Sequence, residues 1–359
     1  MLDGILSASI ADPNGEVGGP TQRADRPSPW QHRPVAKISP LPRPGSTGLL
    51  SRSFGDFLAH SYPPVEHVME PWLPARGLAM VAGFRGIGKT FVASKVAYAI
   101  ATGGAVLGFT APKPRKVLYV DGEMDPAELQ DRFQAIHATA KRERNGRPSL
   151  AAANLRILTH ADQDLGIPDL SDPGGRGREL VERELGDAEV LVLDNLSCLC
   201  RTGVENDAES WAVMQEWLLS LRRAGKTVLI VHHTGKPDKD GNVSQRGTSK
   251  REDILNTSIL LKPAATGRKG EFVLQFTKAR GFAAPDPFAV KLSLENGECT
   301  LERSHANLAA EIAALLDQGL LQKDIAARLG VSPSTITRHK RKVSGRTNRI
   351  MVAAQQPEE

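Results

Sequence analysis

One run of eight residues constrains the fold of this chain more than any other segment. It reads Gly83-Phe84-Arg85-Gly86-Ile87-Gly88-Lys89-Thr90, which has the spacing G-x-x-x-x-G-K-T. A strand-like run at 78–82 precedes it, and an apolar helical pattern at 91–100 follows it. In this setting backbone N–H groups turn toward phosphate, the Lys reaches the β- and γ-phosphates, and the Thr hydroxyl ligates Mg²⁺. The run therefore predicts a nucleoside triphosphate site formed by Gly83, Gly86, Gly88, Lys89, Thr90 and Phe91.

Positive charge is concentrated near the C-terminus. The chain has 359 residues and a net charge of +5. Between Gln322 and Arg349 there are eight Lys or Arg residues and one acidic residue, Asp324. This block carries a larger positive excess than the whole chain, and such an excess favours binding to a polyanion.

The cysteines and the N-terminus indicate the compartment. Cys198, Cys200 and Cys299 are odd in number and lack the spacing of zinc ligands, which predicts a reducing environment and no structural metal. The chain begins without a basic leader region, and no apolar run approaches 18 residues. The sequence therefore predicts a cytoplasmic protein with neither a signal peptide nor a membrane span.

The segments differ in their patterning. Residues 1–50 contain eight prolines and six glycines and are expected to be disordered, because they cannot bury enough apolar surface to offset chain entropy. From 77 to about 303, strand-like and helix-like runs alternate, which predicts an α/β domain with a mostly parallel sheet. The predicted strands are 78–82, 116–121, 154–158, 188–194 and 226–232, and the predicted helices are 89–102, 126–141, 177–185 and 206–224. Later runs predict an antiparallel extension at 257–262, 271–278, 287–294 and 298–302, followed by a helical region at 308–343.

Acidic residues follow two of the predicted buried strands. Asp194 ends the run Val190-Leu191-Val192-Leu193, and Asp121 and Glu123 follow the strand at 116–121. The carboxyl ends of parallel strands face one ligand crevice. We therefore expect Asp194 to hold Mg²⁺ together with Thr90, and Asp121 or Glu123 to activate the attacking water.

Helix capping is the alternative role for acids at this position. Asp125 directly precedes Pro126, the first residue of the predicted helix at 126–141. Asp is favoured as an N-cap and Pro at the first helical position, so Asp125 is predicted to cap this helix. Asp121 and Glu123 remain open to either role on this reasoning alone.

Three motifs resemble segments of RecA-like ATPases. The stretch Val120-Asp121-Gly122-Glu123-Met124-Asp125 resembles the RecA-family segment whose Glu activates water, and Glu123-Met124 is similar to the pair in hexameric replicative helicases. His232-His233 resembles the strand-end pair of RepA-type plasmid helicases. Gln245-Arg246-Gly247-Thr248-Ser249 resembles the Arg-Gly-Ser-Ser element of the same family. The resemblance implies that Glu123 is the general base, with Asp121 as second choice, and that His233 senses the γ-phosphate.

A fourth motif concerns subunit contacts. Phe276-Thr277-Lys278-Ala279-Arg280-Gly281 resembles the Lys-x-Arg of hexameric helicases, in which both cations reach the γ-phosphate on the neighbouring subunit. The resemblance implies that Lys278 and Arg280 act in trans in a homo-oligomer, with a hexamer favoured. A solvated basic hairpin is the alternative. Together the motifs cover about 65–303 and imply a RecA-like P-loop ATPase that uses ATP and Mg²⁺, without an identifiable primase-binding or zinc-binding domain.

A basic loop is the first candidate for DNA contact. Residues 234–251 correspond in position to the second DNA-contacting loop of RecA-like proteins, which lines the channel of a ring or filament. This likeness implies contact with the phosphates of single-stranded DNA without sequence readout. An ordinary surface loop is the alternative. The basic residues of the loop are Lys236, Lys239, Arg246, Lys250 and Arg251.

The C-terminal block is the second candidate. Residues 322–339 resemble a helix-turn-helix, with Gly330 at the turn and Ile325, Leu329 and Ile336 in its core. A preceding helix at 308–317 completes a small all-α unit. The second helix of the motif is expected to enter a major groove of duplex DNA. A helical hairpin for protein contacts is the alternative. The residues expected to face DNA include Thr335, Arg338, Lys340 and Arg341.

These patterns predict four segments and leave two functions open. The segments are a disordered region (1–50), a RecA-like ATPase domain (51–303), a helix-turn-helix domain (304–350) and a flexible tail (351–359). The leading hypothesis is an oligomeric RepA-like helicase or DNA motor in the replication of plasmid or mobile DNA. The alternative is an ATP-gated DNA-binding regulator or replication initiator without unwinding activity.

Overall fold

The computed structural model describes residues 51–201, 208–235, 252–264, 269–304, 308–329 and 336–337. The chain divides into two units, residues 1–64 and 65–359. In the first unit the described part contains one helix, α1 (Phe54–Ala59), capped by the Ser53 hydroxyl, which accepts the Asp56 N–H. All the elements below belong to the second unit. The segment at 1–50, whose disorder is predicted from composition, lies outside the described residues.

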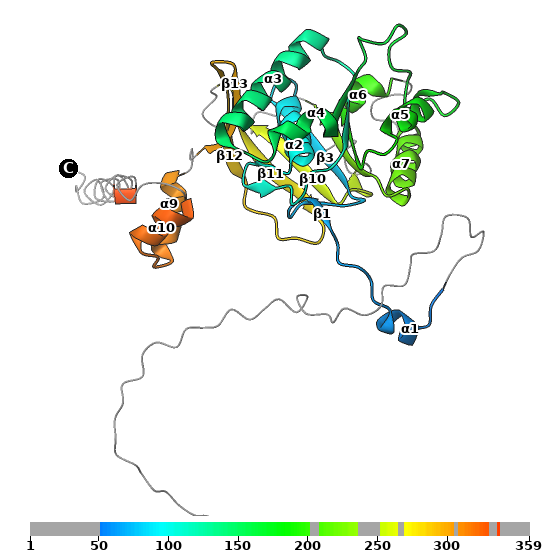
Figure 1. Cartoon of the computed structure of the whole chain (residues 1–359). Helices are drawn as coiled ribbons and strands as arrows, with labels where there is room; N and C mark the ends of the chain where they lie inside the picture. The colour runs from blue at the N-terminus through cyan, green and yellow to red at the C-terminus, as the bar shows by residue number, and fades with distance from the viewer. Residues whose placement is uncertain are drawn as a thin grey trace, which may run out of the picture. The chain divides into compact units, whose positions relative to one another are not determined.

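A nine-stranded sheet forms the centre of the second unit (Figure 1). Its order is β13-β12-β11-β10-β3-β9-β8-β6-β7. Neighbouring strands from β10 to β7 are parallel, whereas β10 to β13 pair antiparallel. The predicted α/β fold with a mostly parallel sheet and an antiparallel extension is therefore confirmed. The parallel strands are β3 (Leu78–Gly83), β6 (Val117–Asp121), β7 (Leu155–Thr159), β8 (Val190–Asp194), β9 (Thr227–His233) and β10 (Thr257–Pro263), and the extension is β11 (Glu271–Ala279), β12 (Phe288–Glu295) and β13 (Glu298–Ser304).

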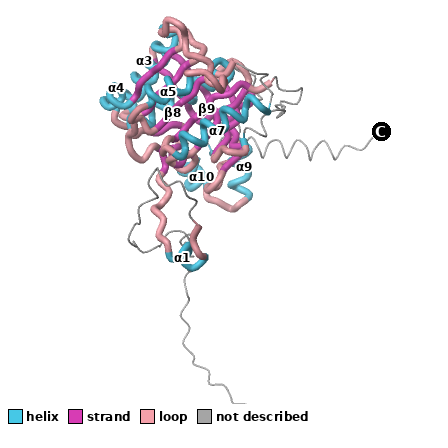
Figure 2. Tube along the Cα trace, turned by 90° about the vertical axis from the view of Figure 1, so that its right-hand side faces the viewer, coloured by secondary structure: helices cyan, strands magenta, loops and turns pink. Residues whose placement is uncertain are grey.

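Helices cover both faces of the sheet, which explains why its inner strands are apolar along most of their length. Every residue of β3, β6 and β8 is buried, as expected for parallel strands covered on two sides. On one face α2 (Lys89–Thr102) and α3 (Pro126–Glu143) contribute Val92, Val96 and Leu129 to the core. On the other, α5 (Gly177–Leu185) and α7 (Ala208–Arg223) contribute Val181 and Leu218. Figure 2, turned by 90°, shows α5 and α7 beside the strands β8 and β9.

Helix boundaries follow local chemistry. The Asp125 carboxylate accepts the Ala127 N–H at the start of α3, with Pro126 as the first helical residue, so the predicted N-cap is confirmed. Several short elements were not predicted, because two to four residues are too few for a periodic pattern. These are β1 (His67–Met69), β2 (Leu73–Pro74), β4 (Ala105–Val106), β5 (Phe109–Thr110), η1 (Pro148–Leu150), α4 (Ala151–Asn154) and α6 (Leu196–Leu199).

The C-terminal helices pack on one another as the sequence predicts. The helices α9 (Leu308–Asp317) and α10 (Gln322–Leu329) bury Ile312 and Ile325 together with Ile336. Ile325 and Ile336 are fully buried, in agreement with the predicted core of the helix-turn-helix. The side chain of Leu329, the third predicted core residue, is not described.

One buried aromatic ring joins the antiparallel extension to the phosphate-binding loop (Gly83–Thr90). Phe272, on β11, has no exposed surface. A Cβ atom placed on Gly88 would lie 3.2 Å from this ring. The Phe272 ring therefore packs against the phosphate-binding loop. The antiparallel extension thus helps to shape this loop as well as completing the sheet.

We expect Phe272→Ala to lower the free energy of unfolding by about 3–5 kcal/mol, because it leaves a cavity in a fully buried position. Leu294→Ala is the matched control, since Leu294 lies in the same extension but is 53% exposed. Urea unfolding of both variants measures the difference. Equal stability of the two variants would contradict the supporting role of Phe272.

Candidate nucleotide site at the carboxyl ends of the strands

The predicted site residues meet at one edge of the sheet. The strands β3, β6, β8 and β9 all end there, with Gly83 paired to His233 and Asp121 paired to Asp194. This edge is where ligands bind in open α/β sheets. The sheet therefore brings together the phosphate-binding loop, both strand-end carboxylates and the His pair, which are far apart in the sequence.

The phosphate-binding loop depends on glycine at two positions for different reasons. Gly88 has a φ of +108°, a left-handed conformation that other residues rarely adopt. At Gly83 a Cβ atom would come within 2.9 Å of the Leu261 carbonyl oxygen on β10. Helix α2 then begins at Lys89 without a side-chain cap. The backbone N–H groups at the amino end of this 14-residue helix are therefore suited to bind an anion.

Lys89 is a buried cation facing the two candidate carboxylates. Its side chain is nearly inaccessible at 4% exposure, and Nζ donates a hydrogen bond to the Phe84 carbonyl oxygen at 2.9 Å. Burial lowers the pKa of Lys89 to about 8, while the nearby charges of Asp194 and Glu123 act in the opposite direction. A cation in this position is suited to phosphate oxygens, and the role of Lys89 in nucleotide binding stays a prediction.

Asp194 is held by a chain of hydroxyl groups. Thr90 Oγ1 donates to Asp194 Oδ1 at 3.4 Å, so the two predicted Mg²⁺ ligands lie side by side. The Tyr119 hydroxyl donates to Asp194 Oδ2, and Ser94 Oγ donates to the Tyr119 oxygen at 3.1 Å. Burial raises the pKa of Asp194 to about 6. Tyr119 and Ser94 thus complete the surroundings of this carboxylate.

Sequence reasoning missed Tyr119, although a signal was present. It lies in the middle of the apolar run Val117-Leu118-Tyr119-Val120 and is completely buried. A buried Tyr needs a partner for its hydroxyl. Because this strand ends at the predicted phosphate site, the strand-end carboxylates are the expected partners of the Tyr119 hydroxyl.

Glu123 lies between Asn195 and His233. Its Oε2 accepts a hydrogen bond from Asn195 Nδ2 and lies 3.4 Å from His233 Nε2. Asn195 Oδ1 accepts the Cys198 N–H at 3.1 Å, which directs the amide NH₂ group of Asn195 toward Glu123. Burial and the charge of Lys89 lower the pKa of His233. Asn195 is a second residue that sequence reasoning missed, because its role depends on a neighbour 72 positions away.

Asp121 occupies a different environment from Glu123. It is 1% exposed, and its Oδ2 accepts the N–H groups of Glu123 at 3.2 Å and Met124 at 2.8 Å. Burial raises its pKa. The Glu123 side chain is 54% exposed. Asp121 therefore shapes the turn after β6, while the Glu123 carboxylate is accessible to a ligand.

Phe91 lies at the start of α2, and its side chain contacts α3. Its ring is partly buried and has the Arg132 guanidinium of α3 above it, 4.4 Å from the ring centre. The structure thus places Phe91 in a contact between α2 and α3. Its predicted part in nucleotide binding stays a prediction.

Lys278 and Arg280 lie away from the phosphate-binding loop of their own chain. The pairing of Thr257 with both Ala79 and Ala279 places the end of β11 at the amino ends of β3 and β10. There Lys278 Nζ donates to the Glu252 carbonyl oxygen, and Arg280 Nη2 donates to the Asp253 carbonyl oxygen at 3.0 Å. The strand β3 separates the two edges by about 16 Å, at about 3.3 Å per residue. These two residues therefore do not join the site within one chain.

Nine predicted DNA-contacting residues lie outside the described residues. Five belong to the loop at 234–251 and four to the second helix of the predicted helix-turn-helix. They are Lys236, Lys239, Arg246, Lys250, Arg251, Thr335, Arg338, Lys340 and Arg341.

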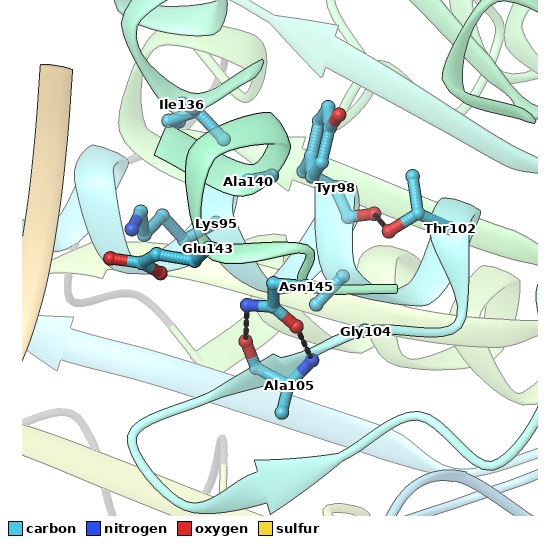
Figure 3. Close-up of a pocket in the computed structure, with 10 residues that line it drawn as sticks. Lys95, Tyr98, Thr102, Gly104, Ala105, Ile136, Ala140, Glu143 and Asn145 are labelled. Carbon is cyan, nitrogen blue, oxygen red and sulfur yellow. Dashed lines mark hydrogen bonds between the residues drawn. The ribbon is translucent and has the colours of Figure 1, made fainter. Parts of the chain in front are cut away.

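A cavity away from the nucleotide site is too small for a ligand (Figure 3). It lies between α2 and α3 and has a volume of about 20 Å³. The Asn145 side chain closes one side by exchanging hydrogen bonds with the backbone of Ala105, both at 2.7 Å. This volume has room for about one water molecule. Figure 3 also shows the Thr102 hydroxyl donating to the Tyr98 backbone carbonyl oxygen, within α2.

The residues at the strand edge fit a magnesium–nucleotide ligand. The uncapped helix start, the buried Lys89 and the adjacent oxygens of Thr90 and Asp194 supply donors for phosphate and ligands for Mg²⁺. The described residues contain no group of three or more His, Cys, Asp or Glu able to hold a metal by themselves. Within the same residues no helix has the length and apolarity needed to cross a membrane.

We expect Tyr119→Phe to raise the Mg²⁺ concentration that supports nucleotide binding about tenfold or more, because Asp194 loses the donor that orients it. Titration of Mg²⁺ against a fluorescent ATP analogue measures this. Tyr98→Phe is the matched control, since the Tyr98 hydroxyl bonds His137 Nδ1 at 2.6 Å, away from the loop. Equal Mg²⁺ dependence in both variants would exclude a role for the Tyr119 hydroxyl.

Comparison with known families agrees with this geometry. A family model described as an AAA domain matches residues 44–239, more than half of the chain. A homeodomain-like domain matches residues 308–347. No curated protein matches the chain. These matches confirm the resemblance to P-loop ATPases of the RepA type and the helix-turn-helix prediction. The chain therefore belongs to the AAA domain family and carries a homeodomain-like helix-turn-helix.

Proposed function

We propose that the chain hydrolyses ATP at the carboxyl edge of the sheet and couples this reaction to DNA. The observation that carries the proposal is the meeting of Lys89, Thr90, Asp194 and Glu123 around one uncapped helix start. Nucleotide binding is implied by the AAA domain, and DNA binding by the homeodomain-like domain. Hydrolysis, the cofactors ATP and Mg²⁺, and the coupling are our inferences from these residues.

Each residue of the site has a separate task. Lys89 and the N–H groups of the phosphate-binding loop bind the phosphates, and Thr90 and Asp194 hold Mg²⁺, which neutralises charge on the phosphate oxygens when bound. Glu123 accepts the proton of the attacking water at Oε1 or Oε2. Asn195 and His233 fix the Glu123 carboxylate in position, and Tyr119 fixes that of Asp194.

We further propose that the active assembly is a homo-oligomer, with a hexamer favoured. Arg280 and Lys278 lie at the sheet edge opposite the phosphate-binding loop of their own chain. Their cationic groups are therefore available to the nucleotide of a neighbouring copy, where they would stabilise the negative charge of the transition state.

The proposed role is that of a RepA-like helicase or DNA motor in the replication of plasmid or mobile DNA. The loop at 234–251 would contact single-stranded DNA, and the homeodomain-like part would contact duplex DNA. The proposed boundaries are an ATPase domain at 51–303, a DNA-binding domain at 304–350, and flanking segments at 1–50 and 351–359. We place the protein in the cytoplasm.

A second candidate is an ATP-gated regulator or initiator that binds DNA without unwinding it. The homeodomain-like match at 308–347 favours this alternative, because such modules read duplex DNA. A strand-displacement assay with the full-length protein separates the two. Unwinding that depends on ATP supports the motor, whereas nucleotide-dependent duplex binding without strand displacement supports the regulator.

We expect Glu123→Gln to bind ATP and Mg²⁺ normally but to hydrolyse ATP at least about 100-fold more slowly, because only water activation is lost. Asp121→Asn is the comparison variant, since Asp121 bonds the backbone of the turn. Steady-state hydrolysis and equilibrium ATP binding are measured for both. Near-normal turnover in Glu123→Gln with loss in Asp121→Asn would move the base to Asp121.

Asn195→Asp tests how Glu123 is positioned. The new carboxylate still accepts the Cys198 N–H as the N-cap of α6, but it repels Glu123 instead of donating to it. We expect about tenfold or greater loss of kcat with unchanged melting temperature and ATP affinity. A fall in melting temperature that accounts for the lost activity would indicate a structural role alone.

The two proposed DNA-contacting elements are expected to separate by mutation. Removing 306–359 should abolish preference for a duplex site while leaving ATP hydrolysis and its stimulation by single-stranded DNA intact. Replacing Lys236, Lys239 and Lys250 by Gln should instead weaken single-strand binding and flatten its salt dependence. Titrations with labelled DNA at two salt concentrations measure both effects. Loss of single-strand stimulation only in the truncated protein would assign that contact to the C-terminal part.

A further inference from the structure

A thiol group lies beside the Glu123 carboxylate, on the short helix α6. The side chain of Cys198 forms a hydrogen bond with the side chain of Glu123. A Cβ atom placed on Gly122 would lie 3.3 Å from the Cys198 Cβ atom, so this cysteine packs on the residue directly before Glu123. The contact therefore joins the turn after β6 to the turn after β8.

Backbone contacts fix the position of Cys198. The Gly122 N–H donates to the Asp194 carbonyl oxygen at 2.7 Å, which holds the two turns together. The Leu199 side chain lies 2.8 Å from the point that a Cβ atom on Gly122 would occupy, and Leu199 is 1% exposed. The Leu199 carbonyl oxygen accepts the Leu170 N–H at 2.9 Å. Cys198 is therefore placed beside Glu123 by the packing of α6.

The thiol is the donor in this contact. An ionised carboxylate accepts hydrogen bonds and does not donate them, so the Cys198 S–H group points to Glu123. Burial and the negative charge of Glu123 raise the pKa of the Cys198 thiol. The thiol therefore stays protonated at neutral pH, as a donor must. The other charged or titratable groups around this pair include Lys89, Asp121, His233 and Arg85.

The Glu123 carboxylate needs fixed donors because much of it is open to solvent. Its side chain is 54% exposed. Asn195 Nδ2 donates to Oε2 of Glu123, and His233 Nε2 lies 3.4 Å from the same oxygen. Asn195 Oδ1 also accepts the Cys198 N–H at 3.1 Å, so the amide and the thiol belong to one network. Donors held by the backbone keep a carboxylate in one orientation, which general-base catalysis requires.

Cys198 is not suited to redox or metal chemistry. A reactive or metal-binding thiol must lose its proton readily, usually beside cations. Burial and the charge of Glu123 act in the opposite direction on Cys198. Within the described ranges no group of three or more His, Cys, Asp or Glu could hold a metal. The chemistry of its surroundings therefore favours the role of a neutral donor.

We propose that Cys198 is a positioning residue for Glu123. Its thiol donates to the carboxylate and, together with Asn195, keeps it directed at the attacking water. The inference rests on the proposed role of Glu123 as general base, and it assigns a task to a cysteine that no sequence motif identifies. A thiol is a weaker donor than an amide, so its loss lowers the rate less than a change at Asn195.

The contact itself is tested without hydrolysis, through the reactivity of the thiol. Cys198 is half-buried, and only its thiolate form reacts with iodoacetamide. Full-length wild type and Glu123→Gln are alkylated over a range of pH, and the peptide containing Cys198 is followed by mass spectrometry. We expect alkylation at neutral pH to be about threefold or more faster in Glu123→Gln, because removing the neighbouring negative charge lowers the pKa of the thiol.

Glu128→Gln is the matched control for this measurement. Glu128 is exposed on the first turn of α3, five positions after Glu123, and its charge does not contribute to the raised pKa of Cys198. Its replacement removes the same charge from the same region of the surface. We expect the alkylation of Cys198 in Glu128→Gln to match that of the wild type.

The positioning role is tested by two replacements of Cys198. Cys198→Ala removes the donor, whereas Cys198→Ser keeps a hydroxyl donor. We expect Cys198→Ala to lower kcat for ATP hydrolysis about threefold to tenfold, with unchanged ATP affinity and melting temperature. The acid side of its kcat–pH profile should move to higher pH, because the ionised carboxylate loses a donor that favours its charged form. Cys198→Ser should retain most of the wild-type rate.

Cys200→Ala is the matched control for the kinetic measurement. Cys200 lies at the end of α6 and packs against the core that α5 and α7 line. The substitution therefore removes a thiol from the same helix without removing the donor to Glu123. We expect its kcat and its kcat–pH profile to equal those of the wild type.

Three results would overturn the proposal. The first is the same pH dependence of Cys198 alkylation in the wild type and Glu123→Gln, which would place the thiol away from the carboxylate. The second is a wild-type kcat and pH profile in Cys198→Ala. The third is an equal loss of rate in Cys198→Ala and Cys198→Ser, which would leave Cys198 as a packing residue. If the wild type does not hydrolyse ATP, the proposed enzymatic function fails, while alkylation still decides whether the thiol contacts Glu123.

Discussion

The nucleotide site depends on one buried cation facing two carboxylates. Lys89 is 4% exposed, and Asp194 is 2% exposed beside it. An isolated buried charge is strongly unfavourable, whereas opposite charges close together offset much of that cost. Their proximity requires that the carboxyl ends of β3 and β8 stay at the same edge with β9 between them. The core of the sheet and the chemistry of its edge are thus linked.

Around this centre, neutral polar groups fix the direction of each charged side chain. Tyr119 and Thr90 donate to the two oxygens of Asp194, and Asn195 donates to Glu123. All three donors come from different segments, namely β6, α2 and the turn after β8. Hydrogen bonds of this kind keep a carboxylate in one orientation, which is what metal binding and proton transfer require. The same network gives Asp121 and Glu123 different surroundings, since Asp121 Oδ2 accepts two N–H groups of the turn after β6.

The antiparallel extension contributes residues to both edges of the sheet. Because β11 runs against β10, its last residues return to the amino side of the sheet, where Arg280 joins Arg76, Arg222 and Arg223. The AAA match ends at residue 239, before this extension begins. The strands that follow therefore supply Phe272 under the phosphate-binding loop and Arg280 at the opposite edge.

The sequence by itself determined the longer elements and the chemical type of the site. The G-x-x-x-x-G-K-T spacing, the apolar runs ending in Asp121 and Asp194, and the strand-to-helix alternation all depend on neighbouring residues, so they are readable along the chain. Only the tertiary structure decided which strands adjoin, because pairing joins residues far apart in sequence. It is this pairing that placed Tyr119 against Asp194, Asn195 against Glu123, and four arginines around one cavity. Such contacts depend on how the sheet is ordered, and no local pattern specifies that order.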